Sequence, residues 1–533
     1  MLCVLRTFNC MLLFESPRNK KKLWYHCRIR ITVRRCGGGF GAKLSRNSLV
    51  SCATALAAWI LKKPVRMTLT LKENMEICGK RWPFAADYKV KVDEKGTIQH
   101  LTSQLFSDHA TGGNEKFYFN NYLFEMLEAM YNTDPFELVL YRTCSDTPGN
   151  TYMRAPGSLE AMIFLENIMD HIAYELKLDP VQVRMNNIRE KKVIDYLDDL
   201  KEWANIEERK EQIETFNKEN RWRKKGLSVV PMTFKFINAG TYAVTISVYH
   251  VDGSVSISHG GIEIGQGVNT KAAQVCAYKL NIPLEKIKIE PSNSFCSPNT
   301  TGTAASLTSD AICYGVDKAT DELLLRLKPF RKDESQTWEQ LIQAAFAGYA
   351  ELRTIAQCTP IEPFVNPYSI YGSCASEIEL DLLTGQYQIT RVDLIEDVGT
   401  SLSPFVDIGQ IEGAFVQGMG YFTSEQLVFG KDGQMLTNNT WFYRPPGAKD
   451  IPIDFRVKIP KDNPNPLGVL QSKAVGEPPL CLSVSIPLAM RNALASARMD
   501  SDSSQPQYVL FNGPTSVEYT YMQSLNNYKQ FIL

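Results

Sequence analysis

The chain has 533 residues, and its 58 Lys plus Arg balance its 58 Asp plus Glu, so its formal net charge at pH 7 is zero. This neutrality excludes a protein that binds nucleic acid through general attraction to phosphates. With 44% hydrophobic and 22% charged residues, the composition excludes a disordered protein and predicts a sizeable core, in roughly three or four domains or in fewer, larger ones.

The N-terminus is apolar over residues 1–14, but Arg6 interrupts it and a polar, basic stretch at 16–22 follows. The apolar part is too short to span a bilayer, and no small-residue cleavage site follows it. We therefore interpret residues 1–30 as a leader outside the folded domains. The next apolar run, 49–61, contains a serine and a threonine and predicts a buried helix, so we expect no membrane segment.

The first half of the chain predicts alternating strands and helices. Residues 28–35 alternate with period two, as a strand does, and a glycine-rich loop leads from them to a helical run at 45–61 that ends before Pro64. The other elements expected here are a strand at 65–71, a hairpin formed by 88–92 and 97–105, and a helix that begins after Pro156.

Charged residues dominate from about 184 to 225, which predicts helices on an exposed connection with solvated charges. We place the domain boundary there. The expected division is a first domain at 31–190 that lacks its own start, the connection at 191–225, a second domain at 226–500 and a C-terminal tail at 501–533.

The second half repeats the order of glycine loop, helix, proline and strand that the first half shows. Its expected elements are strands at 243–250 and 255–257, a glycine-rich loop at 260–267, a helix from about 269, strands at 287–290, 376–382 and 387–395, and a helix from 409. The repetition indicates two lobes that each offer one loop to a shared ligand.

The cysteines and histidines argue against a metal held by protein side chains. No two of the 13 cysteines are spaced as CxxC, which fits neither a disulfide framework nor a zinc or iron–sulfur site. The six histidines include no pair at helical ligand spacing. Scattered thiols indicate a reducing compartment.

The loop from Arg35 to Lys43 reads RCGGGFGAK and contains the spacing GxGxxA, which is typical of dinucleotide-binding loops. Glycines there let backbone N–H groups approach an anion at a helix N-terminus. However, the acid after the next strand, Glu73, lies far beyond the about 20 residues expected for a ribose ligand. A dehydrogenase that binds NAD and a simple tight turn both remain open at this point.

Five further segments combine small residues with one or two polar groups, as a backbone that wraps a large polar cofactor does. They are GNTYMRAPG at 149–157, GIEIGQG at 261–267, TAAS at 303–306, GQIEGAFVQG at 409–418 and KAVGEPP at 473–479. Each alone is more often an ordinary turn, whereas all five in this order are difficult to assign to chance.

With these motifs, the chain resembles the molybdenum-cofactor portion of the xanthine dehydrogenase/aldehyde oxidase family from about residue 31 to about 498, and insect aldehyde oxidases most. The resemblance implies an α/β (α+β) fold of two elongated molybdopterin-binding lobes, with the cofactor at their interface. It implies that Phe40, Arg154 and Ala305 surround the molybdenum and that Glu477 is the catalytic base. The other implied cofactor-binding residues are Gly39, Gly41, Gln266, Gly267, Ala304, Ser306, Gln410 and Gly476.

The implied reaction is a hydroxylation with water as the oxygen source, in which Glu477 accepts a proton and the cofactor takes up the electrons. Glu477 follows a glycine and precedes two prolines, so its carboxylate stands on a rigid turn suited to a positioned base. Without the resemblance, a surface glutamate and an exposed Arg154 salt bridge would be the simpler interpretations.

Relatives also carry two [2Fe–2S] clusters and FAD in domains that precede this region, and we expect a chain without those domains. Purine-oxidising relatives place a glutamate where this chain has Leu44 and a stacking phenylalanine where it has Pro156, and they use an arginine that segment 117–141 lacks. A site without these polar groups leaves a purine unpaired.

We therefore expect a small aldehyde as substrate. Family members are homodimeric and cytosolic, so we also expect a cytoplasmic homodimer without nucleic-acid or membrane partners. The alternatives are a purine hydroxylase and a catalytically silent pseudo-oxidase.

Overall fold

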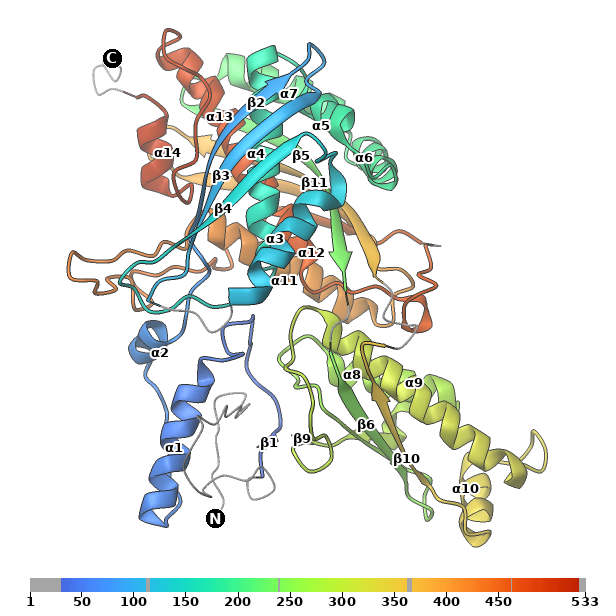
Figure 1. Ribbon diagram of the computed structural model, residues 1–533. Helices are drawn as coiled ribbons and strands as arrows, with labels where there is room; N and C mark the ends of the chain where they lie inside the picture. Colours follow the sequence, from blue (N-terminus) through green and yellow to red (C-terminus); the bar gives the residue numbers. More distant parts are fainter. Residues whose placement is uncertain (1–29, 112–115, 238–239, 362–366, 462, 527–533) are drawn as a thin grey trace.

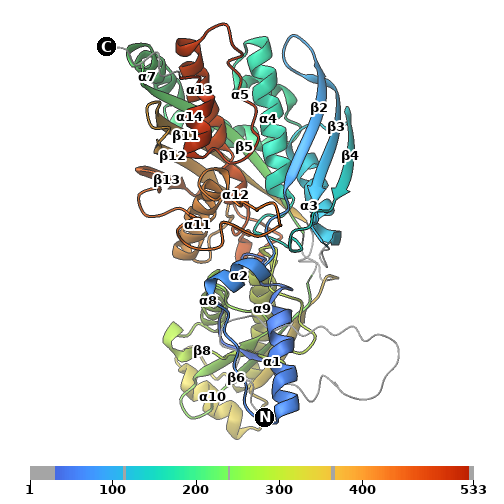
Figure 2. The same cartoon turned by 90° about the vertical axis from the view of Figure 1, so that its left-hand side faces the viewer.

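The computed structural model describes residues 30–111, 116–237, 240–361, 367–461 and 463–526, so the predicted leader lies outside the described residues. The elements form two bodies stacked end to end (Figures 1 and 2). The fourteen α-helices of the described part are α1 (Asn47–Leu61), α2 (Leu71–Ile77), α3 (Lys116–Met130), α4 (Ser158–Leu176), α5 (Pro180–Asn187), α6 (Lys192–Trp203), α7 (Ile206–Glu219), α8 (Val268–Leu280), α9 (Leu307–Leu327), α10 (Trp338–Ala347), α11 (Pro404–Phe422), α12 (Pro478–Leu482), α13 (Ser485–Ser501) and α14 (Val517–Gln523).

The upper body in Figure 1 holds two mixed sheets with α3 to α7 and α11 to α14 around them. Its three-stranded sheet has the order β2-β3-β4, and its four-stranded sheet has the order β13-β12-β11-β5. The strands are β2 (Phe84–Val92), β3 (Ile98–Asp108), β4 (Phe136–Thr143), β5 (Arg223–Phe236), β11 (Tyr368–Asp381), β12 (Tyr387–Glu396) and β13 (Asp454–Lys458).

The lower body is built around a four-stranded sheet of order β10-β6-β7-β8, on which α8 and α9 pack. Its strands are β1 (Thr32–Val33), β6 (Tyr242–Val248), β7 (Val255–His259), β8 (Ile287–Ile289), β9 (Ser292–Asn293) and β10 (Arg353–Cys358). Strand β1 joins this body by pairing with β9, and helix α1 lies beside it (Figure 1). Each body therefore combines segments from both halves of the chain, and the sequence-based domain boundaries stay a prediction.

The core of the upper body lies where α13 packs on β5 and β11. Gly226 of β5 allows this close contact, because a Cβ there would lie 2.0 Å from the carbonyl oxygen of Ala489. The run Pro478–Ser501 has the length and mean hydropathy of a membrane-spanning helix, but 83% of its most apolar window is buried inside the protein. Burial of this kind is typical of a core helix.

The α/β fold class is confirmed, and most predicted elements lie where the sequence placed them. The helix predicted at 49–61 is present as α1, but the expectation that it is buried is wrong, because its large apolar side chains, among them Leu49 and Ile60, are exposed. The strand predicted at 65–71 is wrong: residues 64–70 are irregular and α2 follows. Thr70 begins α2 with a capping box, in which its hydroxyl accepts from the Glu73 N–H and the Glu73 carboxylate accepts from the Thr70 N–H. The dinucleotide interpretation is also wrong, because β1 belongs to a two-stranded antiparallel ribbon and not to a parallel sheet.

The connection at 184–225 is helical as predicted, but its charges are not all solvated. Arg184 is fully buried and donates to the carboxylates of Glu166 (2.5 Å) and Asp170 (2.7 Å). Arg209 is buried between Glu377 (3.0 Å) and Asp393 (2.8 Å). The prediction failed because these acids lie outside the connection, 14 to 184 positions from their arginines in the chain, and a local charge count does not reveal them.

Two buried polar contacts cross from one body to the other. Lys271 of α8 donates to Asp407 of α11 at 2.7 Å, and the Tyr368 hydroxyl of β11 donates to Asp310 of α9 at 2.8 Å. A buried charge or polar group without a partner is costly inside a protein. These two contacts therefore favour one relative placement of the two bodies.

Candidate functional site

Arg154 connects three of the predicted segments at the junction of the two bodies. Its backbone N–H donates to the Phe40 carbonyl (2.8 Å), and its guanidinium donates through Nη2 to the Gln410 carbonyl (3.2 Å) and side-chain oxygen (3.0 Å). Nε of the same group donates to the carbonyl of Gly476. The structure therefore brings Phe40, Gln410 and Gly476 together at Arg154.

Glu477 lies beside this hub, and both of its carboxylate oxygens are fixed. Oε1 accepts from the Ala155 N–H at 2.9 Å, and Oε2 accepts from the Ser306 hydroxyl at 3.4 Å. The preceding Gly476 makes this possible, because a Cβ there would lie 2.5 Å from the Ser306 Oγ. The site brings Glu477, Arg154 and the 305–306 turn together.

Burial and charge act in opposite directions on the two ionisable groups. Burial raises the pKa of Glu477, against the lowering effects of the Ala155 N–H and the Arg154 charge. Burial also lowers the pKa of Arg154 to about 10, against the opposing effects of Glu477 and Glu396. Arg154 is therefore charged at neutral pH, while Glu477 takes up a proton more readily than an exposed glutamate.

Four residues of the site that are not glycine have positive φ: Phe40 (51°), Ala155 (55°), Ala305 (54°) and Ser306 (54°). Only a few per cent of residues other than glycine adopt this region, at a cost of about 1–3 kcal/mol each. Strained residues of this kind concentrate at functional sites. Their grouping here is an indication of function that does not depend on any motif.

The two glycine-rich loops contact each other. The Cys36 N–H donates to the Glu263 carbonyl at 2.8 Å, and a Cβ on Gly39 would lie 3.3 Å from Ile264. Gly41 has a φ of 95° and approaches the Tyr152 carbonyl so closely that a Cβ would lie 2.8 Å from its oxygen. The first loop is thus held between the second loop and the segment that carries Arg154.

The second loop is stabilised by its own side chains. The Glu263 carboxylate accepts from the N–H groups of Gly265 (2.9 Å) and Gly267 (3.0 Å). The Gln266 amide oxygen accepts from Ile264 N–H at 2.7 Å, and its NH₂ donates to the Ile262 carbonyl at 2.9 Å. The Gln266 amide therefore braces the loop, and its predicted role in cofactor binding stays a prediction.

The remaining predicted residues lie on the same segments. Ala304 donates its N–H to the Thr308 hydroxyl at 3.2 Å, at the start of α9. Leu44 donates its N–H to the Gly41 carbonyl at 3.0 Å and packs partly buried against the core. Pro156 is partly buried between Ala155 and the start of α4. The roles of Leu44 and Pro156 in substrate binding stay predictions.

Arg81 is a supporting residue that sequence reasoning missed. Its guanidinium donates to the carbonyls of Arg154 (2.6 Å) and Ala155 (3.4 Å), and it pairs with the buried Glu160 at 3.3 Å. Arg81 therefore fixes the backbone at Arg154 and at Ala155, whose φ is positive. No local motif marks it, because its partners lie more than seventy positions away in the chain.

Glu396, at the end of β12, is a second residue that the sequence did not indicate. It is fully buried, and neither carboxylate oxygen has a hydrogen-bond partner among the described residues. Burial, followed by the charges of Asp407 and Asp397, raises its pKa well above the usual value, and Arg154 acts in the opposite direction. Glu396 therefore holds a proton more readily than an exposed glutamate does.

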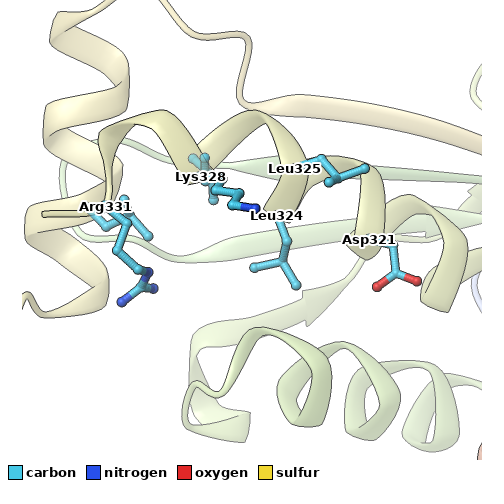
Figure 3. A pocket seen from close by; sticks show the side chains of 7 residues that line it. Asp321, Leu324, Leu325, Lys328 and Arg331 are labelled. Carbon is cyan, nitrogen blue, oxygen red and sulfur yellow. The ribbon is translucent and has the colours of Figure 1, made fainter. Parts of the chain in front are cut away.

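Two cavities in the described part of the chain lie away from this site. A cavity of about 510 Å³ lies between the C-terminal end of α9 and α10, lined by leucines with Asp321, Lys328 and Arg331 at its edges (Figure 3). The 21 residues of α9 put it about 30 Å from Ser306. Hydrogen-bond geometry and backbone strain mark the functional site, and cavity volume does not.

Family models for a molybdopterin cofactor-binding domain match residues 25–188 and 199–452. The fold and the site thus define a molybdopterin-binding protein. Xanthine dehydrogenase/oxidase of Mus musculus is 36% identical over 92% of this chain and 39% of its own length. Xanthine dehydrogenase of Dictyostelium discoideum is 35% identical over 88% of this chain and 37% of its own length.

Solved structures share the fold. Quinoline 2-oxidoreductase of Pseudomonas putida 86 superposes with a TM-score of 0.80 at 20% identity, over 93% of this chain and 68% of that one. Aldehyde oxidoreductase of Desulfovibrio gigas gives 0.75 at 21% identity, over 92% and 54%. The chain belongs to the xanthine dehydrogenase/aldehyde oxidase family, as its molybdopterin-binding portion. It spans less than two fifths of the length of the curated relatives it matches.

The residues present fit this cofactor. Among the described atoms, none lies within 4 Å of the position that a Cβ would take on Gly37 or Gly265, so both loops border open space. Phe40 beside them is 48% exposed. Arg154 and Gln410 supply the polar groups that a polar cofactor requires. Both loops are thus shaped to receive a ligand at the junction of the bodies.

Proposed function

We propose that this chain forms the molybdenum site of a hydroxylase that oxidises aldehydes to carboxylic acids with oxygen from water. The position of Glu477 carries the proposal, because its carboxylate is held by the Ala155 N–H and the Ser306 hydroxyl beside Arg154. A fixed carboxylate with a raised pKa is suited to accept a proton during the reaction.

Bound molybdopterin would supply the two-electron oxidation, and the chain supplies positioning and proton transfer. Glu477 accepts the proton of the attacking hydroxyl on one carboxylate oxygen. The Arg154 charge opposes the rise in the pKa of Glu477 and so favours the ionised form that accepts the proton. Phe40 provides an apolar wall, and the two glycine loops hold the cofactor at the junction of the bodies.

The aldehyde preference is supported by Leu44 and Pro156. Neither side chain offers a hydrogen bond, so the ring nitrogens and carbonyls of a purine would lose partners that they have in water. A purine hydroxylase is the second candidate, because the curated relatives at 35–36% identity are xanthine dehydrogenases. A catalytically silent protein is the third.

The test uses the chain produced in a host that makes molybdopterin, with molybdenum content measured before turnover. An artificial electron acceptor then reports oxidation of an aromatic aldehyde and of hypoxanthine. Glu477→Gln should keep its molybdenum and lose about 10²- to 10⁴-fold in kcat with the aldehyde. Preference for hypoxanthine would favour the second candidate. Loaded protein that oxidises neither compound would favour the third.

A further inference from the structure

Cys36 and Lys43 stand at the two ends of the loop that carries Phe40, and their side chains meet across it. The Lys43 ammonium donates to the Cys36 sulfur at 3.7 Å and to the Gly37 carbonyl at 3.3 Å. The Cys36 thiol donates to the Gly38 carbonyl at 3.3 Å. The sulfur and the amine are thus held together by the loop that they enclose.

The surroundings keep this pair in place and leave open space at the neighbouring Gly37. The Cys36 N–H is bound to the Glu263 carbonyl, and the residue is only 8% exposed, so the sulfur has little freedom to turn away. Next to the cysteine, no described atom lies within 4 Å of the position that a Cβ on Gly37 would take. Hydrogen peroxide oxidises cysteine to a sulfenic acid, which a neighbouring nitrogen can then attack.

We propose that Cys36 and Lys43 form an oxidation site, in which hydrogen peroxide converts the neighbouring thiol and amine into a covalent sulfenamide crosslink. In the first step the Cys36 thiol attacks one peroxide oxygen and the O–O bond breaks, which gives a sulfenic acid and water. In the second step the Lys43 ammonium gives a proton to solvent, and the resulting amine attacks the sulfur, breaks the S–O bond and displaces water, with its remaining surplus proton leaving with that water. One peroxide is reduced, the sulfur is oxidised by two electrons, and the new bond joins S to N.

The crosslink closes a covalent ring around residues 36–43, and this ring includes Phe40 and three positive-φ positions, Gly38, Phe40 and Gly41. The sulfur and nitrogen must approach from 3.7 Å to bonding distance, which shifts a loop that is fixed on both sides. Two equivalents of a small thiol reverse the reaction by restoring the cysteine and the amine. The site would thus modify the loop reversibly.

The sequence around the pair offers a direct assay. Trypsin cleaves after Arg35, Lys43 and Arg46, so the untreated protein releases residues 36–43 as a single peptide. After peroxide, the crosslinked protein should instead release residues 36–46 uncleaved at Lys43, two hydrogens lighter than the linear peptide. A thiol reductant should restore the shorter peptide. This mass measurement does not depend on the proposed oxidase activity.

Two variants and one natural control separate the possibilities. Lys43→Arg keeps the positive charge but should accumulate sulfenic acid at Cys36, which dimedone labels, while Cys36→Ser should give neither product. Cys144 is exposed and should be oxidised without any crosslink. Equal dimedone labelling of Cys36 in the wild type and Lys43→Arg, or normal cleavage at Lys43 after peroxide, would overturn the proposal.

Discussion

The contact between Gly476 and Ser306 allows a sharp test of how the site is built. In Gly476→Ala the new methyl group would lie 2.5 Å from the Ser306 Oγ and 3.3 Å from its Cβ, so the serine must move. Overpacking of this kind costs about 1–3 kcal/mol. The displaced hydroxyl also loses its bond to Glu477, which adds about 1 kcal/mol. We expect Gly476→Ala to lower the free energy of unfolding by about 2–4 kcal/mol.

Urea unfolding of the purified chain measures this loss, and Gly413→Ala is the matched control. Gly413 lies inside α11 with open space around its Cβ position, so alanine there should raise the stability by about 1 kcal/mol. Removing the hydroxyl in Gly476→Ala/Ser306→Ala should relieve the clash, so the double variant should lose clearly less than the sum of the two single changes. Strictly additive losses of stability in the double variant would refute the proposed clash between the new methyl group and Ser306. A Gly476→Ala protein as stable as the wild type would refute it as well.

Three other changes test separate parts of the structure. Burial raises the pKa of Asp310 to about 6, so the folded protein holds this proton more tightly than the unfolded chain does. The free energy of unfolding should therefore fall by about 3 kcal/mol as the pH rises from about 4 to above 6. Asp310→Asn, which still accepts from the Tyr368 hydroxyl, should lack this slope in urea titrations across that range. Lys271→Met should cost about 3–5 kcal/mol by leaving Asp407 buried without its cation, and the added change Asp407→Leu should restore most of the loss. Thr70→Ala should weaken α2 by about 1 kcal/mol, seen as faster amide exchange within that helix and unchanged exchange in α4.

Local patterns in the sequence predicted elements whose partners are close in the chain. The hairpin at 88–92 and 97–105 corresponds to β2 and β3, since its turn and both strands lie in one segment. The segment 65–71 failed because a strand needs a partner, and alternation alone does not supply one. The capping box that begins α2 was present in the sequence, in the spacing of Thr70 and Glu73, and could have been read there.

The candidate site was predictable as a set of motifs, but not as a network. Motifs marked Arg154, Gln410 and Glu477, and the structure brings these residues together. Arg81 and Glu396 carry no motif, because their importance comes from burial and from partners brought close by folding. A sequence shows which residue types are available, whereas desolvation and distant hydrogen bonds depend on the tertiary structure.

The strain at the site explains why so many contacts converge on it. A residue with positive φ reverts to ordinary backbone unless its surroundings fix it, at a gain of about 1–3 kcal/mol. Here each strained residue has a bond or a strained neighbour that holds it: the Phe40 carbonyl accepts from Arg154, Ala155 donates to Glu477, and Ala305 is continuous with Ser306, which donates to Glu477. The bonds come from both bodies, so the geometry exists only while the bodies are docked. Separating the two bodies would release the strain and move these residues apart. The position of the proposed base, Glu477, therefore depends on the buried contacts between the bodies.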